Sequence, residues 1–203
     1  MNYDELLAPA AKLMRPSGIR KFFDLAAEMP HCISLGVGEP DFQTPWMVRK
    51  AAVDSLERKR MVYTANSGMA DLRQEICNYL KRKYDLTYHP ENETLVTVGG
   101  SEAIDLAIRA IVNPGDEVLI VEPSFVCYKP IVELMHGVAI PISTQLKNKF
   151  KLTAEELRSH ITERTKLLIL PYPNNPTGGI MTREDLEAIA EAVSYTHLTL
   201  PTN

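Results

Sequence analysis

Residues 170–179 read LPYPNNPTGG, and they follow the apolar run TKLLIL of residues 165–170. The run predicts a buried strand that ends in an abrupt polar turn. Proline forces the residue before it out of the α region, and glycine permits positive φ, so the turn can hold side-chain amides at the end of the strand. Ligands bind at the carboxyl ends of strands in open α/β sheets. Taken alone, such a sequence more often marks a simple turn between two elements and has no function in binding.

The composition is that of an ordinary soluble globular protein. The 203 residues are 45% hydrophobic and 24% charged, with a formal net charge of −4, which argues against a nucleic-acid partner. Cys32, Cys77 and Cys127 are odd in number and lack metal-ligand spacing, so we expect reduced thiols and no metal site. No leader-like N-terminus or apolar stretch of about 18 residues is present, which predicts a cytoplasmic protein without a membrane partner.

From residue 94 onward, strand-like and helix-like periods alternate, which predicts a parallel α/β sheet. Helix exits at Asn113-Pro114-Gly115 and at His136-Gly137 support this pattern. The expected strands are Leu95–Val98, Val118–Val121, Val138–Ile142 and Lys166–Leu170, and the expected helices are Glu102–Val112, Phe125–Met135, Ala154–His160 and Arg183–Val193.

The first ninety residues have a weaker pattern. Two short helices are expected in residues 1–30, the second capped by Ser17, followed by a short strand from Cys32 into a turn rich in Gly and Pro. Thr44 and Pro45 read as the N-cap and first residue of a helix that ends at Arg58. Residues 61–67 are expected to be irregular and to expose Tyr63, and residues 71–80 to form an amphipathic helix.

A second chemical motif lies in residues 96–104, VTVGGSEAI, where a strand enters a helix through two glycines and a serine. Backbone N–H groups at a helix N-terminus attract anions, glycine permits close approach, and Ser101 adds a hydroxyl, so the turn suits a phosphate. A simple serine N-cap is the competing interpretation. The helix that follows is apolar nearly all round, which predicts a central, buried position.

A third motif, EPSFVCY, occupies residues 122–128 at the exit of another parallel strand. It should bring Phe125 beside the phosphate turn, where an aromatic side chain can stack on a flat ring. A lone aromatic residue is more often part of the core.

Together these stretches resemble the class I/II aminotransferases of the fold-type-I superfamily, which depends on pyridoxal 5'-phosphate (PLP), from about Pro16 to Val193. The resemblance implies an α/β fold with three layers and a mostly parallel sheet, the truncated large domain of the family with an N-terminal segment of the small domain. Residues 17–24, SGIRKFFD, look like a bacterial subgroup with aromatic or broad specificity. The matching motifs, in the family's order and spacing, are GEPDFQTP at 38–45, Tyr63 with Gly68-x-x-x-Leu72-Arg73, VGGSEA at 98–103, PGDEV at 114–118 and PNNPTG at 173–178.

The resemblance also implies a role for each matching residue. Gly100 and Ser101 would hold the cofactor phosphate, and Phe125 would stack on the pyridine ring. Asn175 would bond the ring oxygen and lie near the substrate carboxylate, which the backbone at Gly38 would also meet. Tyr63 would reach the phosphate bound by the neighbouring subunit of a homodimer.

The end of the chain departs from the family's pattern. The family would next supply a strand, an aspartate for the pyridine nitrogen, the Schiff-base lysine and an arginine for the substrate carboxylate, and none of these follows. The lysines present, such as Lys129 and Lys166, lack the required context, so no catalytic residue is nominated. Three segments are expected: an N-terminal arm with part of the small domain at 1–44, a partial PLP-binding large domain at 45–193, and a non-native tail at 194–203 that resembles a translated adapter.

The implied reaction of the full-length parent is transfer of an amino group from an amino acid to a 2-oxo acid. A PLP-dependent C–S β-lyase or related lyase stays open, because such enzymes share the phosphate turn and the asparagine turn. For the chain as written, the expectation is a fragment without the lysine and without activity. The motifs do not specify which amino acid is used.

Overall fold

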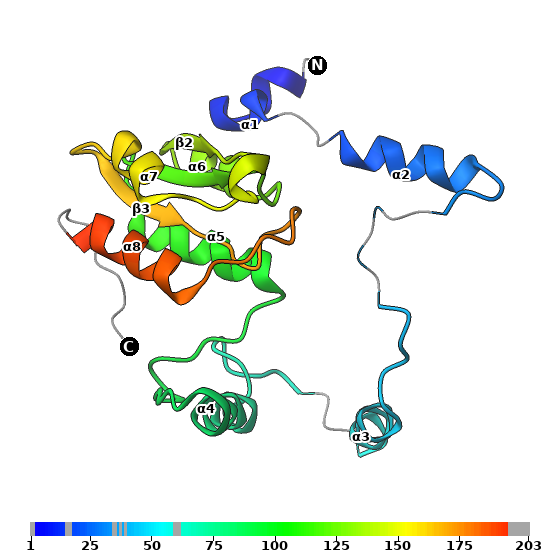
Figure 1. Ribbon diagram of the computed structural model, residues 1–203. Coiled ribbons are helices and arrows are strands. Elements are labelled where there is room, and N and C mark those ends of the chain that lie inside the picture. Colours follow the sequence, from blue (N-terminus) through cyan, green and yellow to red (C-terminus); the bar gives the residue numbers. More distant parts are fainter. Residues whose placement is uncertain are drawn as a thin grey trace. The chain divides into compact units, whose positions relative to one another are not determined.

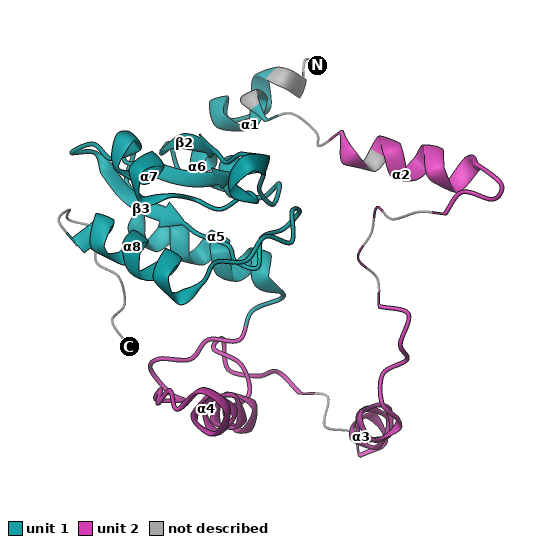
Figure 2. Cartoon of the chain, in the orientation of Figure 1, with its two compact units in different colours: residues 1–15, 97–203 teal, residues 16–96 magenta. Residues whose placement is uncertain are grey.

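The computed structural model describes residues 3–14, 18–33, 36, 38, 40–58 and 62–194. The chain divides into two compact units, coloured separately in Figure 2. We call residues 1–15 with 97–203 the sheet unit, and residues 16–96 the helical unit. Ser17, the strand expected from Cys32 through Leu35, and the tail from Tyr195 onward lie wholly or partly outside the described residues.

A three-stranded parallel sheet forms the centre of the sheet unit (Figure 1). Its strands are β1 (Glu117–Glu122), β2 (Val138–Ser143) and β3 (Thr165–Ile169), in the order β2-β1-β3. The central strand is almost completely buried from Val118 to Val121. A central parallel strand is covered on both faces, which explains why the sequence of β1 is a continuous apolar run.

Helices cover both faces of the sheet, and alternate residues of β1 point to opposite layers. Leu119 and Val121 belong to a core cluster with α7 (Ala154–His160) and α8 (Arg183–Ser194). Val118 and Ile120 belong to a second cluster with α5 (Gly100–Ile111) and α6 (Tyr128–Leu134). The expected three-layer α/β fold with a parallel sheet is confirmed. The remaining short elements of this unit are η1 (Tyr3–Leu6), α1 (Pro9–Leu13) and η2 (Leu146–Asn148).

A buried carboxylate ties the amino ends of two strands together. Glu117, the first residue of β1, has a side chain that is only 4% exposed. It accepts hydrogen bonds from the Arg164 guanidinium and the Thr162 hydroxyl, each at 2.6 Å. Burial of a charged group is tolerated only when such partners are present, so this cluster fixes the start of β1 against the segment that leads into β3.

The helical unit consists of α2 (Ile19–Glu28), α3 (Trp46–Glu57) and α4 (Ala70–Tyr84) with their connections. Arg73 of α4 is buried and donates to the backbone carbonyls of Gly68, Pro90 and Glu91. Gly68 has a φ of 95°, and a β-carbon there would meet Val96 at 2.7 Å, so only glycine fits. None of the helices within the described part of the chain is long and apolar enough to cross a membrane.

Several expected elements differ from the observed ones. Leu95–Val98 is not a strand: it pairs with none of the three strands of the sheet, and the Val96 N–H instead donates to the Ser67 carbonyl at 3.0 Å. Helix α6 begins at Tyr128 instead of Phe125, because residues 125–127 form a turn in which the Tyr128 N–H bonds the Phe125 carbonyl. Helix α3 begins at Trp46 with Pro45 as its N-cap, since the Pro45 carbonyl accepts the first helical hydrogen bonds.

Candidate active site

Three segments come together at the carboxyl edge of the sheet. The loop 123–127 follows β1 and the turn 170–179 follows β3, and these strands are parallel neighbours with Ile120 opposite Ile169. Their carboxyl ends therefore share one edge, which is where ligands bind in open α/β sheets. The amino end of α5 joins them, because Ile104 in its first turns packs against the same core cluster as Phe125 and Cys127 in the loop after β1. All three segments belong to the sheet unit.

The turn into α5 presents unpaired backbone donors. Gly99 is the N-cap with a φ of 86°, and no side chain caps the helix. The first N–H groups of an α-helix have no partner within it, and they lie at the positive end of its dipole. A β-carbon added at Gly100 would meet nothing within 4 Å, so the space at the turn is open. The Glu102 carboxylate turns back to accept the Val98 N–H at 2.5 Å.

Phe125 lies in the loop after β1, partly buried. Its ring meets the Tyr128 ring edge to face, with centroids 5.9 Å apart and planes at 76°. This contact anchors Phe125 to the core cluster beneath α6, of which Tyr128 is a member. The aromatic side chain is therefore held in the segment that packs, with Ile104 of α5, against this cluster.

The turn after β3 is held to its surroundings on two sides. Tyr172 donates its hydroxyl hydrogen to the Phe150 carbonyl at 2.8 Å and accepts the Leu152 N–H at 3.0 Å. Burial raises the pKa of Tyr172 above its ordinary value, so the hydroxyl keeps the proton that it donates. Asn174 is 4% exposed and donates to the Pro123 carbonyl at 2.9 Å. Asn175, the predicted ring-contacting residue, is exposed.

Sequence reasoning missed Asn174, since the resemblance assigns a role only to the adjacent Asn175. A signal was available in the pattern. Asparagine side chains in tight turns often hydrogen bond to backbone groups nearby, so one of two adjacent asparagines is expected to hold the turn together.

The sheet unit thus contains four of the six residues that the resemblance nominated: Gly100, Ser101, Phe125 and Asn175. Tyr63 and Gly38 belong to the helical unit, where Tyr63 is fully exposed. The roles of Tyr63 and Gly38 in the candidate site therefore stay predictions.

The chemistry of these donors fits PLP. Backbone N–H groups at a helix N-terminus and a serine hydroxyl suit a phosphate dianion. An aromatic side chain suits a flat ring, and an exposed amide suits a ring oxygen. The two lysines considered in the sequence analysis lie in other surroundings: Lys129 pairs with Glu133 along α6 at 3.9 Å, and Lys166 lies exposed near the amino end of β3, away from the turn 170–179.

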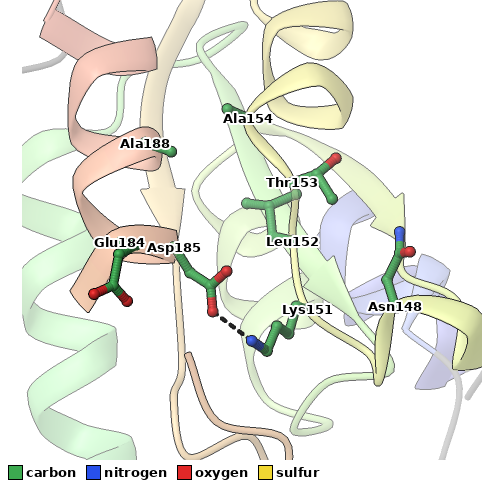
Figure 3. Close-up of a pocket in the computed structure, with 8 residues that line it drawn as sticks. All are labelled: Asn148, Lys151, Leu152, Thr153, Ala154, Glu184, Asp185 and Ala188. Atoms are coloured by element: carbon green, nitrogen blue, oxygen red, sulfur yellow. Dashed lines mark hydrogen bonds and ion pairs between the residues drawn. The ribbon is translucent and has the colours of Figure 1, made fainter. Parts of the chain in front are cut away.

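A pocket of about 410 Å³ lies elsewhere, between the start of α7 and the start of α8 (Figure 3). It shares no residue with the three segments described above. Lys151 and Asp185 form an ion pair across it at 2.5 Å, and the Asp185 carboxylate also accepts the Thr182 N–H at 2.8 Å. Hydrogen bonding from Lys151 lowers the pKa of Asp185, so this carboxylate is ionised and links the start of α8 to the segment before α7.

Comparison with known proteins agrees with these observations. The family described as aminotransferase class I and II matches residues 30–200. A Bacillus subtilis (strain 168) protein named as an aminotransferase, YugH, is 51% identical over 185 residues, which are 91% of this chain and 48% of that protein. The aspartate aminotransferase of Pyrococcus abyssi is 41% identical over 179 residues, covering 88% of this chain and 46% of that one.

The fold agrees as well. The solved structure of Thermus thermophilus aspartate aminotransferase with maleate has a TM-score of 0.84 at 35% identity, covering 93% of this chain and 50% of that one. The chain spans about half the length of the relatives that it matches. With most of its residues matched, the chain belongs to the class I and II aminotransferase family.

Proposed function

We propose that this chain is the N-terminal half of a PLP-dependent aminotransferase that transfers an amino group from an amino acid to a 2-oxo acid. The full-length enzyme is residues 1–193 continued by their natural downstream sequence. The observation that carries the proposal is the meeting of the α5 turn, the Phe125 loop and the Asn175 turn at one edge of a parallel sheet.

Each residue has a defined task in this proposal. The N–H groups at Gly100 and Ser101, with the Ser101 hydroxyl, hold the cofactor phosphate. Phe125 would stack on the ring, and its contact with Tyr128 would hold it in place. Asn175 would donate its amide hydrogen to the ring oxygen and lie near the substrate carboxylate, and the backbone at Gly38 is expected to meet that carboxylate. The bound cofactor supplies the electron sink that stabilises negative charge at the substrate α-carbon.

The other parts of the enzyme follow from the family. We expect the Schiff-base lysine, the aspartate for the pyridine nitrogen and the arginine for the substrate in the other half. We expect a cytoplasmic homodimer of amino acid metabolism in which Tyr63 reaches the phosphate of the neighbouring subunit. Residues 1–44 and 45–193 would be parts of the small and large domains, and residues 194–203 a non-native tail.

The lyase alternative is not favoured, since the relatives above carry aminotransferase names. The experiment is to purify the full-length enzyme with PLP and supply single amino acids with 2-oxoglutarate. A transaminase forms glutamate and the matching 2-oxo acid in equal amounts. A C–S lyase instead releases pyruvate, ammonia and a thiol from a sulfur-containing amino acid, and that product pattern would replace the proposal. Failure to take up PLP would remove the cofactor assignment.

A further inference from the structure

We infer that Asn174 is a positioning residue, whose buried side chain locks the Asn175 turn onto the loop that carries Phe125. The inference rests on the proposed function, because it concerns how two groups that would contact the cofactor ring are held. It adds a residue that touches neither the cofactor nor the substrate.

The lock is a pair of hydrogen bonds from one amide group. Asn174 Nδ2 donates to the Pro123 carbonyl at 2.9 Å and to Thr177 Oγ1 at 3.1 Å. A carbonyl oxygen only accepts, so the nitrogen and not the oxygen of the amide must face Pro123. The first bond crosses from the turn after β3 to the loop after β1, two residues before Phe125. The second bond stays within the turn.

The backbone of Asn174 closes the same turn. Its N–H donates to the Gly179 carbonyl at 2.9 Å, and its carbonyl accepts the Gly178 N–H at 2.8 Å. Thr177 Oγ1 also accepts the Gly179 N–H at 3.1 Å. Asn175 therefore lies inside a short closed loop whose first residue is bonded to the neighbouring segment.

Asn175 depends on this loop for its orientation. Its side chain is exposed, and the structure gives it no hydrogen-bond partner among the described residues. An exposed side chain without partners is placed only by the backbone that carries it, and that backbone is fixed by Asn174.

The amide oxygen of Asn174 indicates that the side chain does more than stabilise the fold. Its Oδ1 is buried and has no hydrogen-bond donor among the described residues. A buried acceptor without a donor opposes folding, and this cost offsets part of what the two Nδ2 bonds contribute. Removing the side chain should therefore change the overall stability little, while it frees the turn.

The test uses four variants of the full-length enzyme: Asn174→Ala, Asn175→Ala, the double variant, and Asn113→Ala as a control. Asn113 is an exposed turn residue before the amino end of β1, where its amide bonds Asp116 at 3.2 Å. Three quantities are measured: the PLP dissociation constant, the midpoint of the pH titration of the bound cofactor's visible absorbance, and hydrogen exchange at the Gly178 amide without cofactor.

We expect Asn174→Ala to weaken PLP binding by about tenfold, as loss of one net hydrogen bond would. It should move the titration midpoint in the direction of Asn175→Ala, and the double variant should move it no further than Asn175→Ala alone, since the two residues act through one contact. Gly178 exchange should be faster in Asn174→Ala, and Asn113→Ala should match the wild type in all three quantities.

The inference is wrong if Asn174→Ala leaves the midpoint and Gly178 exchange unchanged, or if the two single effects add in the double variant. If Asn174→Ala does not fold, Thr177→Val removes one acceptor of the lock and should give a smaller shift of the same sign, with no shift contradicting the inference. If the wild type binds no PLP, the proposed function fails and the positioning role fails with it, whereas Gly178 exchange still reports on the lock.

Discussion

Ser101 at the amino end of α5 lies close to the Cys127 thiol in the loop after β1, close enough to affect the pKa of that thiol. Cys127 is the N-cap residue of α6, and it is partly buried. Burial raises the pKa of this thiol, and the nearby Ser101 side chain opposes that rise to a smaller extent. The thiol is therefore protonated at neutral pH.

The protonated state of Cys127 predicts low reactivity. Alkylation by iodoacetamide requires the thiolate, so Cys127 should react more slowly than the exposed Cys32 at pH 7.5, and its rate should still be rising above the pH at which an ordinary thiol has ionised. Peptide mass spectrometry over time measures both sites in one sample. Equal rates at the two cysteines would contradict the prediction that burial raises the pKa of Cys127.

Gly100→Asp should weaken PLP binding strongly in the full-length enzyme. The substitution places a carboxylate beside the phosphate dianion, and repulsion at short range in a shielded site costs several kcal/mol by order of magnitude, or roughly a hundredfold or more in the dissociation constant. Gly100→Asn is the matched control, because it has nearly the same shape without the charge, and the turn has space for a side chain. Equal affinities in the two variants would remove the phosphate assignment.

Asn175→Ala should raise the midpoint pH of the bound cofactor's absorbance titration. A hydrogen bond donated to the ring oxygen favours its ionised form, so its loss makes protonation easier and raises the apparent pKa. The titration is followed in the visible spectrum of the full-length enzyme. A curve that superimposes on the wild type would leave Asn175 as a turn residue only.

Arg164→Ala should lower the free energy of unfolding by about 1–3 kcal/mol, because it leaves the Glu117 carboxylate buried without its cation. The exposed Arg158 of α7 offers a matched control, and Arg158→Ala should change stability by less than about 0.5 kcal/mol. Urea unfolding of the full-length enzyme measures both. Equal effects would show that the cluster at the amino ends of β1 and β3 does not stabilise the sheet.

Elements with a strong local pattern could be predicted from the sequence. Helix α7 occupies Ala154–His160 as expected, because Thr153 and Glu156 form a capping box that defines its start. Strands β1 and β2 lie within a residue of their expected ends, since a run of apolar residues between helix exits leaves little choice. The start of α5 at the Gly99-Gly100-Ser101 turn could be predicted for the same reason, as its two glycines and serine are adjacent in sequence.

Features that depend on distant partners could not be predicted. Leu95–Val98 has the composition of a strand, but a strand also requires another strand to pair with, and the sequence does not say which segments pair. The contact of Asn174 with Pro123 spans fifty-one positions, so it appears only when the sheet is assembled. The role expected of Tyr63 depends on a partner in a neighbouring subunit, so it stays a prediction.

The central claim is that this chain forms half of a PLP enzyme whose other half supplies the reactive lysine. The most direct measurement compares amino-group transfer to 2-oxoglutarate by the full-length enzyme with transfer by residues 1–203 at equal protein concentration and saturating PLP. We predict turnover by the full-length enzyme and none by residues 1–203, which should also lack cooperative unfolding because expected sheet strands are missing. Equal turnover by the shorter chain, with cooperative unfolding, would contradict the claim.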